Sequence, residues 1–377
     1  MFSQSAQRLV LEPRGGRAVC GIAAQELCDR SGLPYLYFTA VKGASTTEST
    51  AQLLTGLTKS DLPNDHAPLP STPPAGGWGD MLRLLAGTLP DRPCIDAYLI
   101  TGGLPGILLR WPAGTSAEDY LRDESADPAS PLFAVPEQSL ASEFPNPDVA
   151  RRVLEAVGGD ARAFATIANA AGGRGGSVSS GTLSPLLRQL TDDKQILAAD
   201  QPLSTGGGKP TLYRVADSNL RLYLAILRDV LNLTRRGRPD AGYALFQNRW
   251  SSWRGRAVEP LVRASLQQAT VSGTFPWPDA QAVGGWWNRQ FNPEIDLVGA
   301  DRAPVASRIH FGGSLKWLGT PFDTHDLRSL QEGVRRVPGF DASHTGLIVV
   351  TRSGTELAAD AVDVVWGPGD VVAAWQS

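Results

Sequence analysis

Two charged side chains lie where apolar strands are expected, and their types suit phosphate chemistry. Asp296 lies inside the run Glu294-Ile-Asp-Leu-Val, and Lys316 ends the run Ile309-His-Phe-Gly-Gly-Ser-Leu-Lys. A carboxylate can hold Mg²⁺, and a lysine can orient water or stabilise a pentavalent phosphorane. An unpaired charge inside an apolar strand is costly. We therefore expect the two side chains to meet, either as a metal-dependent centre or as a salt-bridged pair left from a dead site.

The order of these residues resembles the PD-(D/E)xK nuclease core, in which one strand carries an acid and the next carries acid-x-Lys. Ser314 stands where the second acid belongs. Two residues could replace that acid: Glu259 on a preceding helix, and Glu294, which alternates onto the same side of its strand as Asp296. The catalytic candidates are thus Glu259, Glu294, Asp296 and Lys316, with Asp296 as the metal ligand. Because serine cannot act as a charged ligand, we expect slow cleavage or none with Mg²⁺.

The elements that must position these residues alternate between strand and helix, as in a small α/β domain. Apolar runs and helical periodicity predict helices over 258–268 and 324–335, and strands over 294–298, 307–311, 346–351 and 362–366. We assign this nuclease-like domain to residues 251–377. Trp286 and Trp287 are expected to pack in its core. Arginines at 235, 236, 238, 249, 254 and 256 form the most basic stretch of the chain, which we interpret as a solvated surface.

A second unit is expected over residues 148–216. Periodicity predicts helices over 149–157, 161–171 and 179–193, followed by strands over 196–203 and 211–215 with a glycine-rich connection. Three helices and a hairpin form a winged helix, and Arg188, Lys194 and Lys209 would supply phosphate contacts in DNA binding. Asp192 and Asp193 oppose that reading, and a structural lid is the alternative. A helical connector is assigned to residues 217–250.

Several segments together resemble the archaeal-type ATPases, which are AAA/STAND-like proteins with a P-loop domain, a winged helix and a nuclease-like domain. The matching segments are Leu33-Pro-Tyr-Leu-Tyr-Phe-Thr-Ala, Tyr98-Leu-Ile-Thr-Gly-Gly-Leu-Pro, Tyr213-Arg-Val-Ala-Asp-Ser-Asn-Leu-Arg, Trp253-Arg-Gly-Arg-Ala-Val-Glu-Pro-Leu-Val and Gly285-Trp-Trp-Asn. The resemblance implies an ATP-binding protein that uses ATP and Mg²⁺. It also implies an α/β fold class: a truncated P-loop-like remnant over 1–147, the winged helix, and a restriction-endonuclease-like domain.

The phosphate loop of that family is degenerate here. Gly16 and Gly21 keep the glycine spacing, but Ile22 and Ala23 stand where Lys and Ser/Thr belong. The run Pro93-Cys-Ile-Asp-Ala-Tyr98 begins like the strand that should end in Mg²⁺-binding acids, and then passes directly into the Tyr98 segment. We therefore expect impaired ATP hydrolysis and weak or no ATP binding. The alternative function is a non-catalytic DNA-binding or regulatory protein.

The composition restricts the binding partners and the cellular location that can be expected. A formal net charge of −3 gives no general attraction to nucleic acid, so any contact must come from a local patch. No apolar run approaches the roughly 20 residues of a membrane span. The three cysteines lack metal-ligand spacing. A reduced, cytoplasmic location is the expectation.

Overall fold

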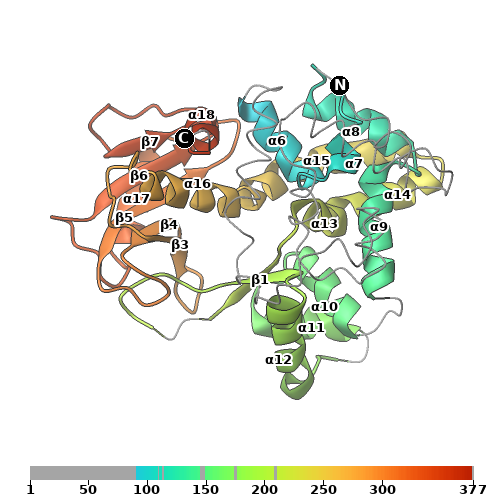
Figure 1. Cartoon of the computed structure of the whole chain (residues 1–377), viewed down its shortest axis with the longest axis horizontal. Coiled ribbons are helices and arrows are strands. Elements are labelled where there is room, and N and C mark those ends of the chain that lie inside the picture. Colours follow the sequence, from blue (N-terminus) through green and yellow to red (C-terminus); the bar gives the residue numbers. More distant parts are fainter. Residues whose placement is uncertain are drawn as a thin grey trace, which may run out of the picture.

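The structure is a computed structural model, and it describes residues 91–375 except 109, 113, 145–148, 174–175 and 208–209. Within that part the fold is mixed α/β, with a helical part and a five-stranded sheet (Figure 1). The predictions for the P-loop-like segment, Gly16 and Gly21 included, lie outside the described residues. Among the described helices, none is long and apolar enough to cross a membrane.

The first helices pack together through apolar side chains. They are α6 (Asp91–Thr101), α7 (Pro105–Leu108), α8 (Ala117–Ala126) and α9 (Pro131–Glu143). The interpretation of residues 93–98 as the start of a strand is wrong, because they lie within α6. A short apolar run suits either a buried strand or a buried helix. Helix α6 ends at Thr101, and the next two residues, Gly102 and Gly103, have φ values of 61° and 73° that favour glycine.

The order predicted over 148–216 is present. Helices α10 (Val149–Gly158), α11 (Phe164–Gly172) and α12 (Ser180–Arg188) are followed by the π-helical turn η3 (Gln189–Asp193). Strands β1 (Leu197–Asp200) and β2 (Leu212–Val215) then pair antiparallel. Leu183, Leu187 and Leu190 are buried, as the apolar stripe along this helix requires.

The connection between β1 and β2 lies against the C-terminal sheet. Leu203 N–H donates to Gly285 O at 2.8 Å, and Thr205 N–H donates to Pro338 O at 3.1 Å. Trp287 Nε1 donates to Pro210 O at 2.8 Å. Leu203 itself is buried in the core of the sheet part. The described residues of this connection therefore join the helical part to the sheet part.

A helical segment leads to the sheet. It comprises α13 (Ser218–Leu222), the π-helical turn η4 (Tyr223–Leu227), α14 (Arg228–Arg235), α15 (Pro239–Ala257) and α16 (Glu259–Val271). The domain boundary assigned between residues 250 and 251 falls inside α15. Arg254 is 7 % exposed, so the interpretation of this arginine as solvated surface is wrong. It pairs with Asp96 of α6 at 3.1 Å.

The C-terminal sheet has the order β3-β4-β5-β6-β7. Its strands are β3 (Ala282–Trp287), β4 (Glu294–Ala300), β5 (Ile309–Lys316), β6 (Gly346–Thr351) and β7 (Val364–Trp366). The first three pair antiparallel, whereas β5, β6 and β7 pair parallel. Helix α17 (Thr324–Val334) makes the crossover from β5 to β6, and α18 (Pro368–Ala373) ends the described chain. Parallel neighbours require such a crossover.

One core cluster runs from α6 to α18 and a second lies under the β1–β2 connection and α17. Trp286 and Trp287 are both buried, which confirms that they pack in the core. In the turn of residues 301–307 between β4 and β5, Asp301 Oδ1 accepts the backbone N–H groups of Ser307 and Arg308. The meander and crossover bring the middle of β4, the end of β5 and the start of α17 together, and this is the setting of the candidate site.

Candidate functional site

Asp296 lies on β4 beside the end of β5. Its Oδ2 accepts the Ser314 hydroxyl at 3.1 Å and the Leu315 backbone N–H at 2.8 Å. The carbonyl oxygen of Asp296 accepts Arg263 Nε at 2.9 Å, and the same guanidinium contacts Glu259 Oε2 at 3.2 Å. The chain thus gathers Glu259, Asp296 and Ser314 at one place. Three of the positions singled out from the sequence are neighbours.

The carboxyl of Asp296 is held in its protonated form more readily than usual. Burial, together with the negative charge of Glu259, raises its pKa from 3.8 to about 6. The hydrogen bonds from Leu315 and Ser314 and the charge of Arg263 act in the opposite direction but do not cancel the rise. Raised acid pKa values cluster at functional sites, although structural carboxylates show them as well.

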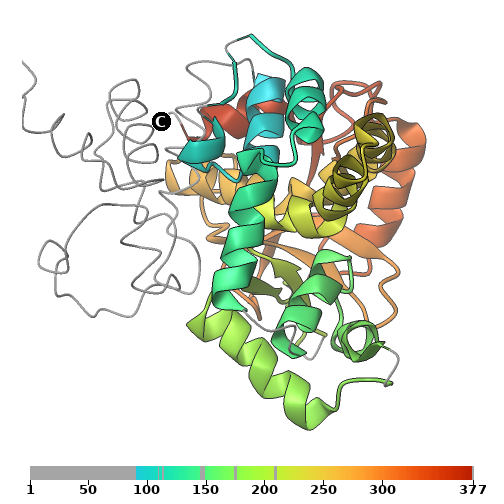
Figure 2. The same cartoon turned by 90° about the vertical axis from the view of Figure 1, so that its right-hand side faces the viewer.

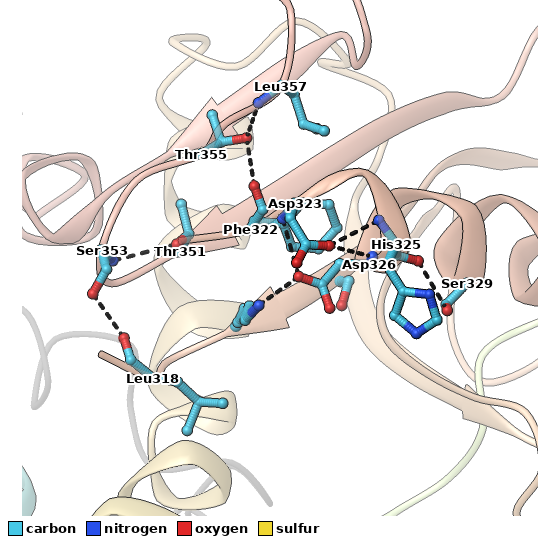
Figure 3. A network of polar contacts seen from close by, with 12 residues as sticks. Leu318, Phe322, Asp323, His325, Asp326, Ser329, Thr351, Ser353, Thr355 and Leu357 are labelled. Atoms are coloured by element: carbon cyan, nitrogen blue, oxygen red, sulfur yellow. Dashed lines mark hydrogen bonds and ion pairs between the residues drawn. The ribbon is translucent and has the colours of Figure 1, made fainter. Parts of the chain in front are cut away.

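Lys316 does not pair with Asp296. Its Nζ lies 2.5 Å from Oδ2 of Asp326, which belongs to the first turn of α17. Asp326 also accepts the Asp323 backbone N–H at 3.0 Å, and Asp323 Oδ1 accepts the N–H groups of His325 and Asp326 in return (Figure 3). This reciprocal capping fixes the helix start. The lysine is therefore committed to the helix and not to the acid on β4.

An open cavity of about 480 Å³ lies beside these residues. Its wall includes Asp296 and Ser314 from the sheet, Asp326 from α17, and Glu294 at the start of β4. Glu294 points an oxygen at Arg162, with Oε1 3.4 Å from Nη1. Arg336 is the one basic residue in the lining. The lining of the cavity is therefore acidic, and it presents more hydrogen-bond acceptors than donors.

The residues present do not fit a divalent cation. Among the described residues no group of three or more His, Cys, Asp or Glu side chains could hold a metal ion. The carboxylates that would coordinate one already bond to protein donors: Asp296 to Ser314 and Leu315, Glu259 to Arg263, and Asp326 to Lys316. Mg²⁺ needs near-octahedral oxygen ligation. The donor set supplies no such shell.

The residues expected to contact DNA are placed differently. Arg188 is exposed at the end of α12. Lys194 Nζ lies 2.7 Å from Glu143 and 5.7 Å from the ring centroid of Phe144, so it ties the three-helix unit to α9. Lys209 lies outside the described residues. Of the two that the structure describes, Arg188 is the one with an exposed side chain.

Two residues of the site were not found from the sequence. Asp326 comes three residues after Asp323, a spacing that predicts a capping box but not a partner for Lys316. Arg263 lies one helical turn after Glu259, a spacing that predicts an ion pair along a helix. His310, by contrast, is buried on β5 and does not line the cavity.

Comparisons with family models, with curated proteins and with solved structures found no match.

Proposed function

We propose that this chain is a member of the archaeal-type ATPase class whose described part binds duplex DNA without cutting it. In this proposal a winged helix over α10–β2 provides a DNA contact and a nuclease-like domain over α16–α18 serves as a non-catalytic scaffold. The P-loop-like segment contributes weak ATP binding or none, because Ile22 and Ala23 replace its lysine and its hydroxyl residue.

The strand and helix order supports a nuclease-like core. The order is a helix (α16), an antiparallel meander of three strands (β3–β5), a crossover helix (α17) and a parallel strand (β6). Asp296 lies on the middle strand of the meander and Ser314 and Lys316 on the last. This is the arrangement that the acid and acid-x-Lys positions require.

The loss of cleavage rests on one observation, the hydrogen-bonded state of Asp296. Its Oδ2 is occupied by the Ser314 hydroxyl and the Leu315 N–H, and Lys316 is held by Asp326. Phosphodiester cleavage in such a core depends on free carboxylate oxygens and a lysine directed at the same place. Lys316 is directed at Asp326 instead, and the Asp296 oxygen that faces the end of β5 is already bonded, so we assign the domain a binding role.

The exposed side of α12 supports the DNA contact. Ser180, Thr182, Ser184 and Arg188 are exposed on one helix whose leucines face inward. Figures 1 and 2 both show α12 at one end of the molecule, away from the sheet. Hydroxyl and guanidinium groups are donors to phosphate oxygens. Asp192 and Asp193 in η3 limit the affinity, so binding should be weak and salt-dependent.

Arg188→Ala should weaken duplex binding. Each phosphate contact releases counterions, so loss of one contact lowers the slope of log affinity against log salt by about 0.9. The slope is measured by fluorescence anisotropy of a labelled duplex at salt concentrations from roughly 50 to 200 mM, the range over which such binding weakens. Arg236→Ala, an exposed arginine at the end of α14, is the matched control. Equal slopes for Arg188→Ala and the unmodified chain would leave α12 a structural helix.

Ser314→Glu should be the one change that brings cleavage. It restores an acid beside Asp296, at the position from which the serine hydroxyl now donates to Asp296 Oδ2 at 3.1 Å. Relaxation of supercoiled plasmid with Mg²⁺ or Mn²⁺ measures the result, and Ser314→Gln, with similar volume and no charge, is the control. Robust cutting by the unmodified chain that is abolished by Asp296→Ala would contradict the non-catalytic assignment.

A further inference from the structure

The cavity beside β4 has apolar side chains in its lining as well as acidic ones. Pro293, Ile295 and Leu330 contribute to it, and Ile295 and Leu330 are buried in the core of the sheet part. Its volume of about 480 Å³ lies within the usual range of small-molecule sites, roughly 300–1,000 Å³. A hollow that combines apolar surface with oxygen acceptors suits a ligand with a hydrocarbon stem and a polar head.

Two carboxylates in this lining each keep one oxygen free. The protein donors described above bond to Oδ2 of Asp296 and to Oδ2 of Asp326. Within the described part of the chain no donor reaches Oδ1 of either residue, and neither Oδ1 is buried. Two separate oxygens are too few to replace the hydration shell of Mg²⁺. Each can, however, accept an N–H group of an organic cation.

The charge of the lining is negative after its ion pairs are taken into account. The charged side chains of the lining are Glu294, Asp296, Asp326, Glu332 and Arg336. Arg162 and Lys316 pair with two of these carboxylates, so two carboxylates remain against Arg336. The ion pair of Glu259 with Arg263 adds no net charge behind Asp296. An excess of one negative charge favours a ligand that carries one positive charge, and it disfavours phosphate.

We propose that this cavity binds an alkylguanidinium group, with the guanidinium at Asp296 and Asp326 and the hydrocarbon stem against Pro293 and Leu330. A guanidinium is planar, carries five N–H donors and is more weakly hydrated than an ammonium group, so it suits acceptors in a half-buried setting. The site lies apart from α12 and does not depend on DNA binding. Free arginine and the arginine side chain of a partner protein share this chemistry, and the test separates them.

The first arm uses N-acetyl-arginine amide in isothermal titration calorimetry at pH 7.5, where Asp296 is ionised because its pKa is about 6. The unmodified chain should bind it, and Asp296→Asn should bind it at least about tenfold more weakly, since a charge-assisted hydrogen bond contributes roughly that factor. Asp229→Asn, which changes an exposed carboxylate of α14 outside the lining, is the control and should bind as the unmodified chain does.

Two further comparisons keep this arm decisive. N-acetyl-citrulline amide, which has nearly the same shape without the charge, should bind at least about tenfold more weakly than the arginine compound. Glu332→Gln changes an exposed side chain of the lining, so it tests the charge even if Asp296→Asn does not fold, and it should also weaken binding. Absence of binding to the unmodified chain, or equal binding of the arginine and citrulline compounds, overturns the site.

The second arm compares free arginine with the blocked compound. Tighter binding of free arginine that is lost in Arg336→Gln identifies a small molecule, because Arg336 is the lining residue that can pair with its carboxylate. Tighter binding of the blocked compound identifies a side chain of a partner protein. Neither arm contains nucleic acid, so arginine binding by a chain that ignores the labelled duplex would reject the DNA-binding proposal alone. Duplex binding without arginine binding would reject this site alone.

Discussion

Replacing Asp96 by alanine is expected to lower the free energy of unfolding by about 3–5 kcal/mol, the usual result of removing one partner from a buried ion pair. Asp96 Oδ2 lies 3.1 Å from Arg254 Nη1 and 3.3 Å from Arg352 Nη2, and the aspartate is 6 % exposed. Without it, two guanidinium groups remain in the interior with no carboxylate between them. Urea unfolding monitored by tryptophan fluorescence measures the change.

The effect is large because the two guanidinium groups are already short of hydrogen-bond partners and would lose the carboxylate that they share. Among the described residues, Asp96 Oδ1, Arg254 Nε and Arg352 Nε are buried without a hydrogen-bond partner. Burial raises the pKa of Asp96, although both arginines oppose the rise, and burial lowers the pKa of Arg254. Asp229→Ala, which removes an exposed partner of Arg249, is the control and should change stability little. A loss below about 1 kcal/mol for Asp96→Ala would show that water reaches the triad.

Replacing Asp296 by asparagine is expected to stabilise the protein at pH 7.5. The pKa of Asp296 is about 6 in the folded chain against an ordinary value of 3.8. The folded state therefore binds more protons than the unfolded state between about pH 4 and pH 6, and stability falls as pH rises through that window. A difference of about two pH units corresponds to at most roughly 3 kcal/mol. Asparagine keeps an oxygen for the Ser314 and Leu315 donors and carries no charge.

The measurement is the melting temperature of both proteins from pH 4 to pH 8. The melting temperature of the asparagine variant should not show the fall between pH 4 and pH 6. Above pH 6 it should be higher than that of the unmodified chain. Asp301→Asn is the control with the opposite sign, because the backbone N–H groups of Arg308 and Ser307 lower the pKa of Asp301. The ionised Asp301 carboxylate stabilises the folded chain at neutral pH, and this stabilisation is lost as the pH falls. A less stable Asp296→Asn at pH 7.5 would mean that the ionised carboxylate is favourable where it lies.

Much of the sheet could be predicted from the sequence because its strands are continuous apolar runs. Residues 294–298 and 346–351 read directly as β4 and β6. Strand β3 was not assigned, since Gly284 and Gly285 interrupt it and glycine weakens a strand pattern. A Cβ added at Gly285 would lie 2.6 Å from Nη2 of Arg263, so a larger residue there would displace that guanidinium. Such a contact depends on the fold and leaves no local pattern.

The charged residues were harder to predict because a sequence does not state which charges pair. Arg254 looked like one of a basic surface stretch, yet the fold buries it against an aspartate 158 positions away. Lys316 was expected beside Asp296, but the crossover helix places Asp326 within its reach. The partner of Arg254 lies far away in the sequence, whereas the partner of Lys316 lies ten residues on, at the start of the following helix. Alternation and periodicity predict the face of a strand or helix on which a side chain lies, but not the residue that it contacts.

The segment between β1 and β2 has a consequence for how the molecule opens. Leu203 and Thr205 donate backbone hydrogen bonds to residues of the sheet part, and Trp287 donates its indole N–H back to Pro210. Separating the parts would break all three bonds at once and expose Leu203 to water. Amide hydrogens at positions 203 and 205 should therefore exchange with deuterium as slowly as those of β4, although they lie in a loop. A protease that nicks exposed loops should leave residues 203–205 intact until the whole chain unfolds.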